Sequence, residues 1–165
     1  MDSAAGDVTP SPADEQPTGE WPASEWPLTA LLRGARAVIG SVIRRALDDA
    51  GYDDLPPNGP YVIGAIARTS APLASVVRQL GVSKQAGGQL VDTLVVRGYL
   101  DRSVDPTDRR RLVVGLTDRG AAAAAVVRGA VDTVEDDLRA TVGDRQLQAA
   151  RQVLGALIDR EVRDA

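Results

Sequence analysis

The stretch that decides how the rest of this chain is interpreted is residues 94–120, LVVRGYLDRSVDPTDRRRLVVGLTDRG. Apolar and polar residues alternate over 99–104 and 111–116, which predicts two short strands. The segment between them, residues 105–110, is polar, contains a proline and is typical of a turn. The stretch therefore predicts a β-hairpin with an arginine-rich tip, and Thr117 is a candidate N-cap for a helix that follows it.

Two short helices joined at a glycine are predicted before the hairpin. The first begins around residues 70–72, where Pro72 stands near the first helical position, and it ends at Gly81. The second runs over residues 84–97 after Ser83, a candidate N-cap. Its expected apolar side consists of Ala86, Leu90, Val91 and Leu94. Two helices followed by a hairpin are the order of a winged helix-turn-helix.

Further helices are predicted on both sides of this unit. Apolar residues recur at spacings of three and four over 28–47 and from 144 to 158, and a short helix is expected around 61–67. Another helix runs from about Asp118 past Leu138, and a break at residues 142–143 separates it from the last one. The fold class is therefore mainly α with a small β-hairpin. The apolar faces of the first and last helices fit ordinary core, dimer contacts, or both.

The chemistry open to the chain is narrowed by its composition. With no cysteine and no histidine among 165 residues, thiol and histidine chemistry, disulfides and ordinary zinc sites are excluded. No apolar run approaches the roughly 18 residues of a membrane span, and no secretory signal is apparent. Glycine-rich phosphate loops and nucleophile–base pairs are also absent. We therefore expect a cytoplasmic protein that is not an enzyme and has no cofactor and no metal.

The net charge of −4 conceals a basic centre. Residues 1–27 hold six acids and no bases, whereas residues 56–120 hold nine bases and five acids. Residues 28–55 are neutral in sum, and residues 121–165 carry a balance of −2. The acidic start of the chain thus hides a central block with a balance of +4, which suits a nucleic-acid partner.

Polar residues follow one side of the helix predicted over residues 84–97. They are Lys84, Gln85, Gly88, Gln89 and Asp92. Glutamine can bond adenine through two hydrogen bonds, and lysine reaches guanine or phosphate. Ser83 and Lys84, at the helix N-terminus, suit a phosphate contact. We expect Asp92 to pair with an arginine rather than with a base. The paired glycines 87–88 either let the helix backbone approach DNA closely or mark a bend.

The hairpin tip supplies a second set of candidate contacts. Arg109, Arg110 and Arg111 can reach the minor groove, where negative potential attracts arginine. Asp108 can hold one of these guanidinium groups in place.

These residues resemble the MarR (multiple antibiotic resistance regulator) family. The resemblance rests on residues 94–102 and 105–120, which match a helix ending in Leu-x-x-x-Gly-Tyr, an arginine, Asp-Pro-x-Asp-x-Arg, and a strand ending Leu-Thr-x-x-Gly. Residues 82–86 also look like the start of the family's recognition helix. The long acidic N-terminal segment and the paired glycines depart from the pattern.

The resemblance implies a homodimer that binds double-stranded DNA at a palindromic site. Its first and last helices would interlock within one domain over residues 25–165. Residues 1–24 are rich in Asp, Glu, Pro, Ser, Thr and Gly and poor in large apolar side chains, so their composition predicts a disordered acidic tail. Residues 25–55 and 121–165 would carry the dimerisation helices, and residues 56–120 the DNA-binding lobe.

Individual roles are implied in the same way. Asp108 and Arg110 match the wing pair that the family aims into the minor groove, and Arg102 matches an arginine that braces the wing. Many members bind a small aromatic or phenolic effector between the dimer helices and the lobe. Trp26, Tyr52 and Tyr61 are candidates for such a pocket or for core packing.

The function predicted from the sequence is therefore a ligand-responsive homodimeric repressor of transcription. The alternative is a winged-fold adaptor that contacts proteins and no longer binds DNA. The wing arginines and the basic central block favour the first.

Overall fold

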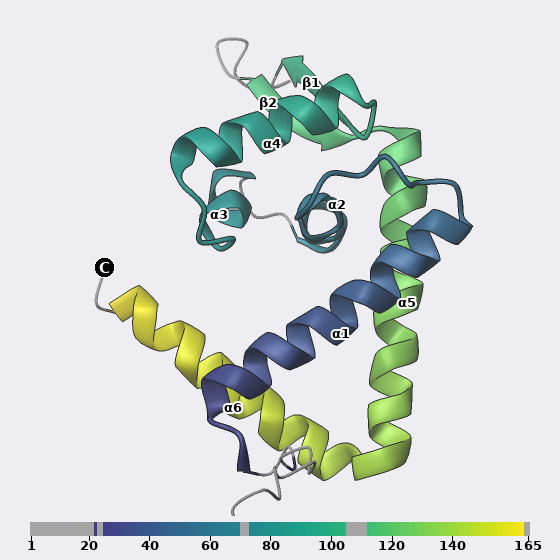
Figure 1. Cartoon of the computed structure of the whole chain (residues 1–165). Helices are drawn as coiled ribbons and strands as arrows, with labels where there is room; N and C mark the ends of the chain where they lie inside the picture. Colours follow the sequence, from purple (N-terminus) through teal and green to yellow (C-terminus); the bar gives the residue numbers. More distant parts are fainter. Residues whose placement is uncertain (1–21, 23–24, 70–72, 105–111, 164–165) are drawn as a thin grey trace, which may run out of the picture. The chain divides into compact units, whose positions relative to one another are not determined.

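The computed structural model describes residue 22 and residues 25–69, 73–104 and 112–163. The predicted acidic tail over residues 1–24 and the hairpin tip therefore lie almost wholly outside the described residues. The elements, in chain order (Figure 1), are α1 (Leu28–Asp49), α2 (Gly59–Arg68), α3 (Leu73–Arg78), α4 (Lys84–Val96), β1 (Leu100–Val104), β2 (Leu112–Leu116), α5 (Asp118–Val142) and α6 (Asp144–Arg163). This order confirms the predicted fold class, a mainly helical chain with one small hairpin.

Among the described residues, those at 22 and 25–35 belong to one compact unit and those from 36 to 163 to another. Within the first, the amides of Ala30 and Leu31 donate to the Pro27 carbonyl at 2.9 and 3.1 Å and so begin α1. The Trp26 ring lies alongside this helix, since a Cβ added at Gly34 would meet its Cζ3 atom at 3.8 Å. Trp26 thus packs on α1, as one of the two sequence interpretations expected.

The second unit is built around the hairpin. β1 and β2 pair antiparallel, from Leu100 opposite Leu116 to Val104 opposite Leu112. α2 packs on α5 and on β2, and α4 packs on β1. The largest fully buried side chains among the described residues belong to Val62, Ile63, Leu94, Tyr99 and Leu100. Both the helix-turn-helix and the hairpin are therefore held by one apolar core.

One predicted core position is wrong. Ala86 is exposed, while Gly87 is buried. Val91 and Leu94 are buried and Leu90 is partly buried, as expected. At the N-terminal end of α4, the residue that faces the core is therefore Gly87 and not Ala86, because α4 packs against α3 at this glycine.

The boundary between α5 and α6 lies where the sequence predicted it. Gly143 has a φ of 83°, a conformation that suits glycine and ends α5. Arg139 donates from Nε to Asp144 at 2.8 Å and also pairs with Asp136. These hydrogen bonds, that to Asp144 foremost, raise the pKa of Arg139. One guanidinium therefore joins the end of α5 to the start of α6.

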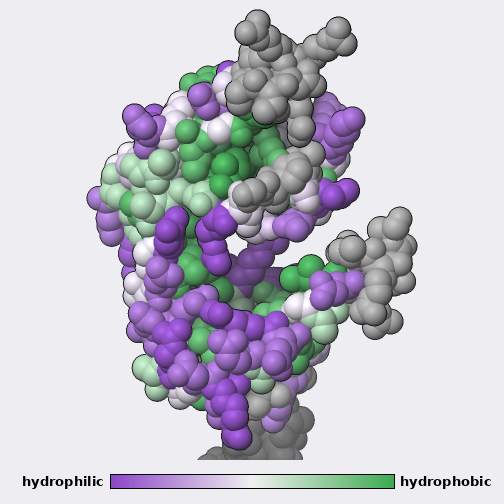
Figure 2. All heavy atoms as spheres, turned by 180° about the vertical axis from the view of Figure 1, so that it is seen from behind, coloured by the Kyte–Doolittle hydropathy of each residue, from purple (hydrophilic) through white to green (hydrophobic). Residues whose placement is uncertain are grey.

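None of the helices in the described part of the chain is both long and apolar enough to cross a membrane. Apolar side chains nonetheless reach the surface between hydrophilic ones (Figure 2). On α6 the exposed ones are Val153, Leu154, Leu157 and Ile158, and Val38 is exposed on α1.

Candidate nucleic-acid interface

The turn between α3 and α4 is set by a glycine and a serine. Gly81 has a φ of 66°, in the left-handed region that β-carbon sterics make unfavourable for other residues. The Ser83 Oγ then accepts a hydrogen bond from the Ala86 amide at 3.2 Å, which confirms the predicted N-cap. Lys84 is consequently the first residue of α4.

Gly87 is required where α4 meets α3. A Cβ at this position would lie 2.1 Å from Cγ1 of Val77, a distance at which something must shift. The hypothesis that both glycines serve a close approach to DNA is therefore wrong for Gly87, whose missing side chain allows α3 and α4 to pack. Gly88 is exposed, with open space around its Cα, so the hypothesis stays a prediction for Gly88 alone.

The polar side of α4 faces outward. Lys84, Gln85, Gly88 and Gln89 are all exposed. Within residues 73–104 and the other described ranges, no side chain pairs with those of Lys84, Gln85 or Gln89. Their hydrogen-bonding groups are therefore available to a ligand.

The base of the hairpin is joined to this helix by an ion pair. Arg102, on β1, donates from Nη2 to the Asp92 carboxylate on α4. This confirms that Asp92 pairs with an arginine. Arg102, predicted among the DNA contacts and as a brace for the wing, makes the bracing contact. Both side chains are about half exposed, so the ion pair adds only about 0–1 kcal/mol to the stability of the fold. Its main effect is on the orientation of the hairpin relative to α4.

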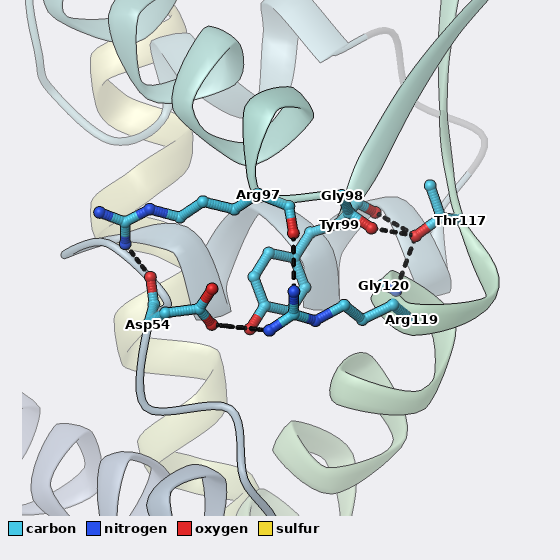
Figure 3. A network of polar contacts seen from close by, with 7 residues as sticks. All are labelled: Asp54, Arg97, Gly98, Tyr99, Thr117, Arg119 and Gly120. Atoms are coloured by element: carbon cyan, nitrogen blue, oxygen red, sulfur yellow. Dashed lines mark hydrogen bonds and ion pairs between the residues drawn. The ribbon is translucent and has the colours of Figure 1, made fainter.

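A polar network lies on the other side of the hairpin base (Figure 3). Tyr99 donates its hydroxyl hydrogen to the Asp54 carboxylate, and Arg119 donates from Nη2 to the same oxygen at 3.0 Å. The Arg119 Nη1 also donates to the Arg97 carbonyl at 2.9 Å, and Arg97 in turn donates to the Asp54 carbonyl. The network links the loop before α2, the end of α4 and the start of α5.

The network shifts the pKa values of two of its members. The hydrogen bond from Tyr99 is the main cause that lowers the pKa of Asp54, with the Arg119 charge acting in the same direction. Burial, together with the hydrogen bond to Asp54, raises the pKa of Tyr99 to about 12. Asp54 is therefore held ionised and Tyr99 protonated.

The Leu-Thr-x-x-Gly motif at residues 116–120 lies where the start of α5 passes close to the backbone of Gly98 and Tyr99. The Thr117 Oγ1 donates to the Gly98 carbonyl at 2.6 Å and accepts from the Gly120 amide at 3.0 Å, which confirms the predicted cap of α5. A Cβ at Gly120 would stand 1.9 Å from the Tyr99 carbonyl oxygen. Glycine is thus needed there for α5 to pass over the strand start.

The remaining candidate residues divide into two groups. Asp108, Arg109 and Arg110 lie outside the described residues. Tyr52 packs in the core with its ring centroid 6.3 Å from that of Tyr99, and the Tyr61 hydroxyl donates to Gln79 at 3.1 Å.

The sequence interpretation missed the network around Asp54. Arg119 and Tyr99 lie within residues 94–120, from which the hairpin was predicted. Asp54 lies about 45 residues before Tyr99, and in the sequence it was only one of the acidic residues in the neutral segment 28–55. The described residues contain no group of three or more carboxylates placed to hold a metal ion.

Residues 53–111 match the model of the MarR family. No curated protein sequence matched. Among solved structures, the transcriptional repressor CouR bound to a 23-mer DNA duplex is 25% identical, with a TM-score of 0.62 over 82% of this chain and 94% of that one.

Two further structures show the same fold at lower identity. The S. aureus MepR–DNA complex is 16% identical, with a TM-score of 0.65 over 82% of this chain and 99% of that one. Apo MarR from E. coli is 20% identical, with a TM-score of 0.57 over 80% of this chain and 97% of that one.

The α3–turn–α4 unit, the hairpin and the flanking helices together define a winged helix-turn-helix protein. The segment that matches the MarR-family model covers the loop before α2, the helix-turn-helix and the start of the wing, and the chain shares its fold with the CouR and MepR structures. The chain therefore resembles the MarR family over this segment.

Proposed function

We propose that this protein is a sequence-specific DNA-binding regulator of transcription. The observation that carries the proposal is the outward polar side of α4, where Lys84, Gln85 and Gln89 are exposed. A helix in this position of a winged helix-turn-helix enters the major groove. The DNA in the CouR and MepR structures supports the same partner for this chain.

The exposed polar residues at and after the N-cap of α4 have distinct roles in this proposal. Gln85 and Gln89 bond base edges, which gives sequence preference. Ser83 and Lys84 contact phosphate at the helix N-terminus, which fixes orientation. Gly88 lets the backbone approach the groove.

The wing provides the second contact. Asp108 orients Arg110 into the minor groove, and Arg109 adds a phosphate or groove contact. Arg102, through its ion pair with Asp92, holds the hairpin base at a fixed angle to α4. The two contacts therefore act as one rigid unit.

The protein acts as a homodimer in this proposal. Residues 25–55 and 121–165 carry the dimerisation helices, and residues 56–120 the DNA-binding lobe. The support is the exposed apolar residues on α6, among them Leu157 at 48% and Ile158 at 60% exposure, and Val38 on α1 at 62%. A patch of this kind on one helix marks an interaction site. Two lobes related by a two-fold axis read a palindrome, with half-sites about 34–36 Å apart.

The proposed effect on transcription depends on where the dimer binds. Bound to a palindromic operator, it occludes the promoter and represses transcription. A small effector that favours one spacing of the two lobes shifts the population of DNA-competent dimers.

The proposal is tested by fluorescence-anisotropy binding to DNA selected from a random pool, at two salt concentrations. We expect an inverted repeat bound by two chains, with an affinity that falls steeply as salt rises. If no sequence is enriched and no duplex binds, the winged fold serves protein contacts and the proposal is wrong.

A further inference from the structure

Lys84 is the only lysine of the chain, and the other 18 basic residues are all arginine. The sequence also holds no cysteine and no histidine. Serine, threonine and tyrosine hydroxyl groups are weak nucleophiles unless a neighbouring base activates them. The side-chain amine of Lys84, once it has lost a proton, is therefore the strongest nucleophile among the side chains of this sequence, and it occurs once.

Other cations are also exposed on this surface, so exposure alone does not set Lys84 apart. A guanidinium group stays protonated in proteins, which prevents an arginine from attacking a carbonyl group. The ammonium group of a lysine can lose a proton and form an amide, and the positive charge then disappears. Of the 19 basic side chains, only that of Lys84 can lose its charge by this reaction.

The position of Lys84 gives this one charge a particular weight. Lys84 is the first residue of α4 and is exposed, directly after the N-cap Ser83. α4 holds only one other charged residue, Asp92, and that carboxylate is paired with Arg102 of β1. On α4 itself, Lys84 is thus the single cation, and the attraction of this helix for phosphate depends on it.

We propose that Lys84 is a site of acyl transfer and that its acylation weakens the binding of DNA; the second half of this inference rests on the proposed function. The neutral amine attacks the carbonyl carbon of an acyl phosphate or an acyl thioester. A C–N bond forms, and the C–O or C–S bond breaks as the phosphate or thiolate leaves with the electron pair. Starting from the ammonium group, two protons are released, one to the leaving group and one to solvent.

Acylation replaces an ammonium group by a neutral amide. A homodimer then loses one phosphate contact in each lobe, so the salt slope of DNA binding should fall by about two contacts. Affinity at about 0.1 M salt should fall by about tenfold or more. The fold should not suffer, because a positive charge is unfavourable at a helix N-terminus and the side chain is exposed. Loss of DNA binding and loss of stability are therefore separable.

DNA and the acyl donor compete for the same nitrogen atom. An ammonium group that is bound to phosphate has no lone pair with which to attack a carbonyl group. A duplex bound to α4 should therefore protect Lys84 from acylation, and an acylated chain should in turn bind the duplex poorly. Chains that are free of DNA are the ones that become modified, which makes the loss of binding persist after release.

The test treats the full chain with acetyl phosphate in one arm and with acetyl-coenzyme A in the other, so that the two arms distinguish the donor. Mass spectrometry of peptides locates the acetyl groups, and anisotropy with the selected duplex measures affinity at two salt concentrations. We expect Lys84 to be acetylated in at least one arm, and more slowly when the duplex is bound. The treated chain should bind the duplex about tenfold or more weakly, with the lower salt slope.

Two variants make the test specific. Lys84→Arg keeps a cation but has no amine, so its affinity should be the same before and after treatment. Lys84→Gln resembles the neutral amide and should show the low salt slope without treatment. Thermal unfolding of Lys84→Gln should occur at or above the temperature of the wild type, because the substitution removes a positive charge from a helix N-terminus.

The inference is overturned if acetyl groups are found only at other positions, or if acetylated Lys84 leaves affinity and salt slope unchanged. It is also overturned if treated Lys84→Arg loses as much affinity as the treated wild type, since the effect then comes from another group. Failure of the untreated chain to bind any duplex overturns the proposed function instead. In that case the positions of the acetyl groups still decide whether Lys84 is the modification site.

Discussion

The guanidinium carbon of Arg119 lies 4.5 Å from the centroid of the Tyr99 ring, and Nη2 of the same arginine lies 3.1 Å from the Tyr99 hydroxyl oxygen. Arg119 thus contacts both the face and the polar end of one buried side chain. Since Tyr99 starts the wing and Arg119 starts α5, the pair fixes the direction in which α5 leaves the hairpin. The polar network of Figure 3 therefore stabilises the join between the winged helix-turn-helix and the long helix α5.

This network predicts a loss of stability at alkaline pH. Tyr99 is uncharged when protonated, and its pKa is raised from about 10 to about 12. The contribution is complete below pH 10 and is lost as pH rises from 10 through 12, because only the unfolded chain ionises in that interval. The free energy of unfolding should fall by at most about 3 kcal/mol over the interval. Urea unfolding across pH measures it, and Tyr99→Phe should remove most of this dependence.

Stability should also fall at acidic pH, and urea unfolding can measure this loss too. The pKa of Asp54 is lowered below its ordinary 3.8, so its contribution is complete above that value and is lost as pH falls through the folded-state pKa. Asp54→Asn should flatten the acid limb, with Asp53→Asn, at an exposed neighbouring position, as the control. An acid limb that is the same in both variants would contradict the role of the network.

The paired glycines of α4 should respond in opposite directions to alanine. Gly87→Ala places a methyl group against Val77 and should destabilise the fold by about 1–3 kcal/mol or more. Gly88→Ala meets nothing and should stabilise it by up to about 1 kcal/mol through helix propensity. If Gly88 serves the close approach to DNA, its variant should be more stable yet bind the duplex more weakly. Equal effects of the two substitutions on unfolding would rule out the packing explanation.

These glycines also show how far sequence reasoning reaches. Periodicity and caps sufficed for the helices, the hairpin and the breaks at Gly81 and Gly143, because each depends on local conformational preference. The inward turn of Gly87 depends on Val77, ten residues away, and the Asp54 contact closes a much longer loop. Such contacts are set by tertiary packing, which no local pattern encodes. The outward side of α4 was predictable because helical spacing alone places it.

The ion pair between Arg102 and Asp92 should affect DNA binding more than stability. Both side chains are half exposed, so Asp92→Asn should change the free energy of unfolding by less than about 1 kcal/mol. It removes the charge-assisted contact between the hairpin base and α4, while their apolar packing remains, and should weaken DNA binding severalfold. Asp101→Asn is the control, since Asp101 is an exposed carboxylate on β1 outside this ion pair. Asp101→Asn also removes one negative charge, a change that by itself favours binding to polyanionic DNA, so an equal loss of affinity in both variants would contradict the bracing role.

Two further variants should distinguish contacts to base edges from contacts to phosphate, because the first affect sequence preference and the second affect overall affinity and its salt dependence. Gln85→Ala should lower the preference for the selected sequence over a scrambled duplex, by about 1–3 kcal/mol, with little change in salt dependence. Arg110→Ala should weaken binding to both duplexes and lower the salt slope by about one contact. Anisotropy titrations on both duplexes measure these quantities. A uniform loss from Gln85→Ala, or an unchanged slope from Arg110→Ala, would remove that residue from the interface.

Dimerisation should depend on the exposed apolar side of α6. Leu157→Glu places a charge among Val153, Leu154 and Ile158, so association there would bury an unpaired carboxylate, which costs several kcal/mol. Sedimentation should show a shift toward monomer and a parallel loss of affinity for the inverted repeat. Gln152→Glu adds the same charge on the opposite side of α6 and should leave the dimer intact. Since Leu157 is 48% exposed, the single chain keeps its fold in either case. A dimer that survives Leu157→Glu would place the interface on another element.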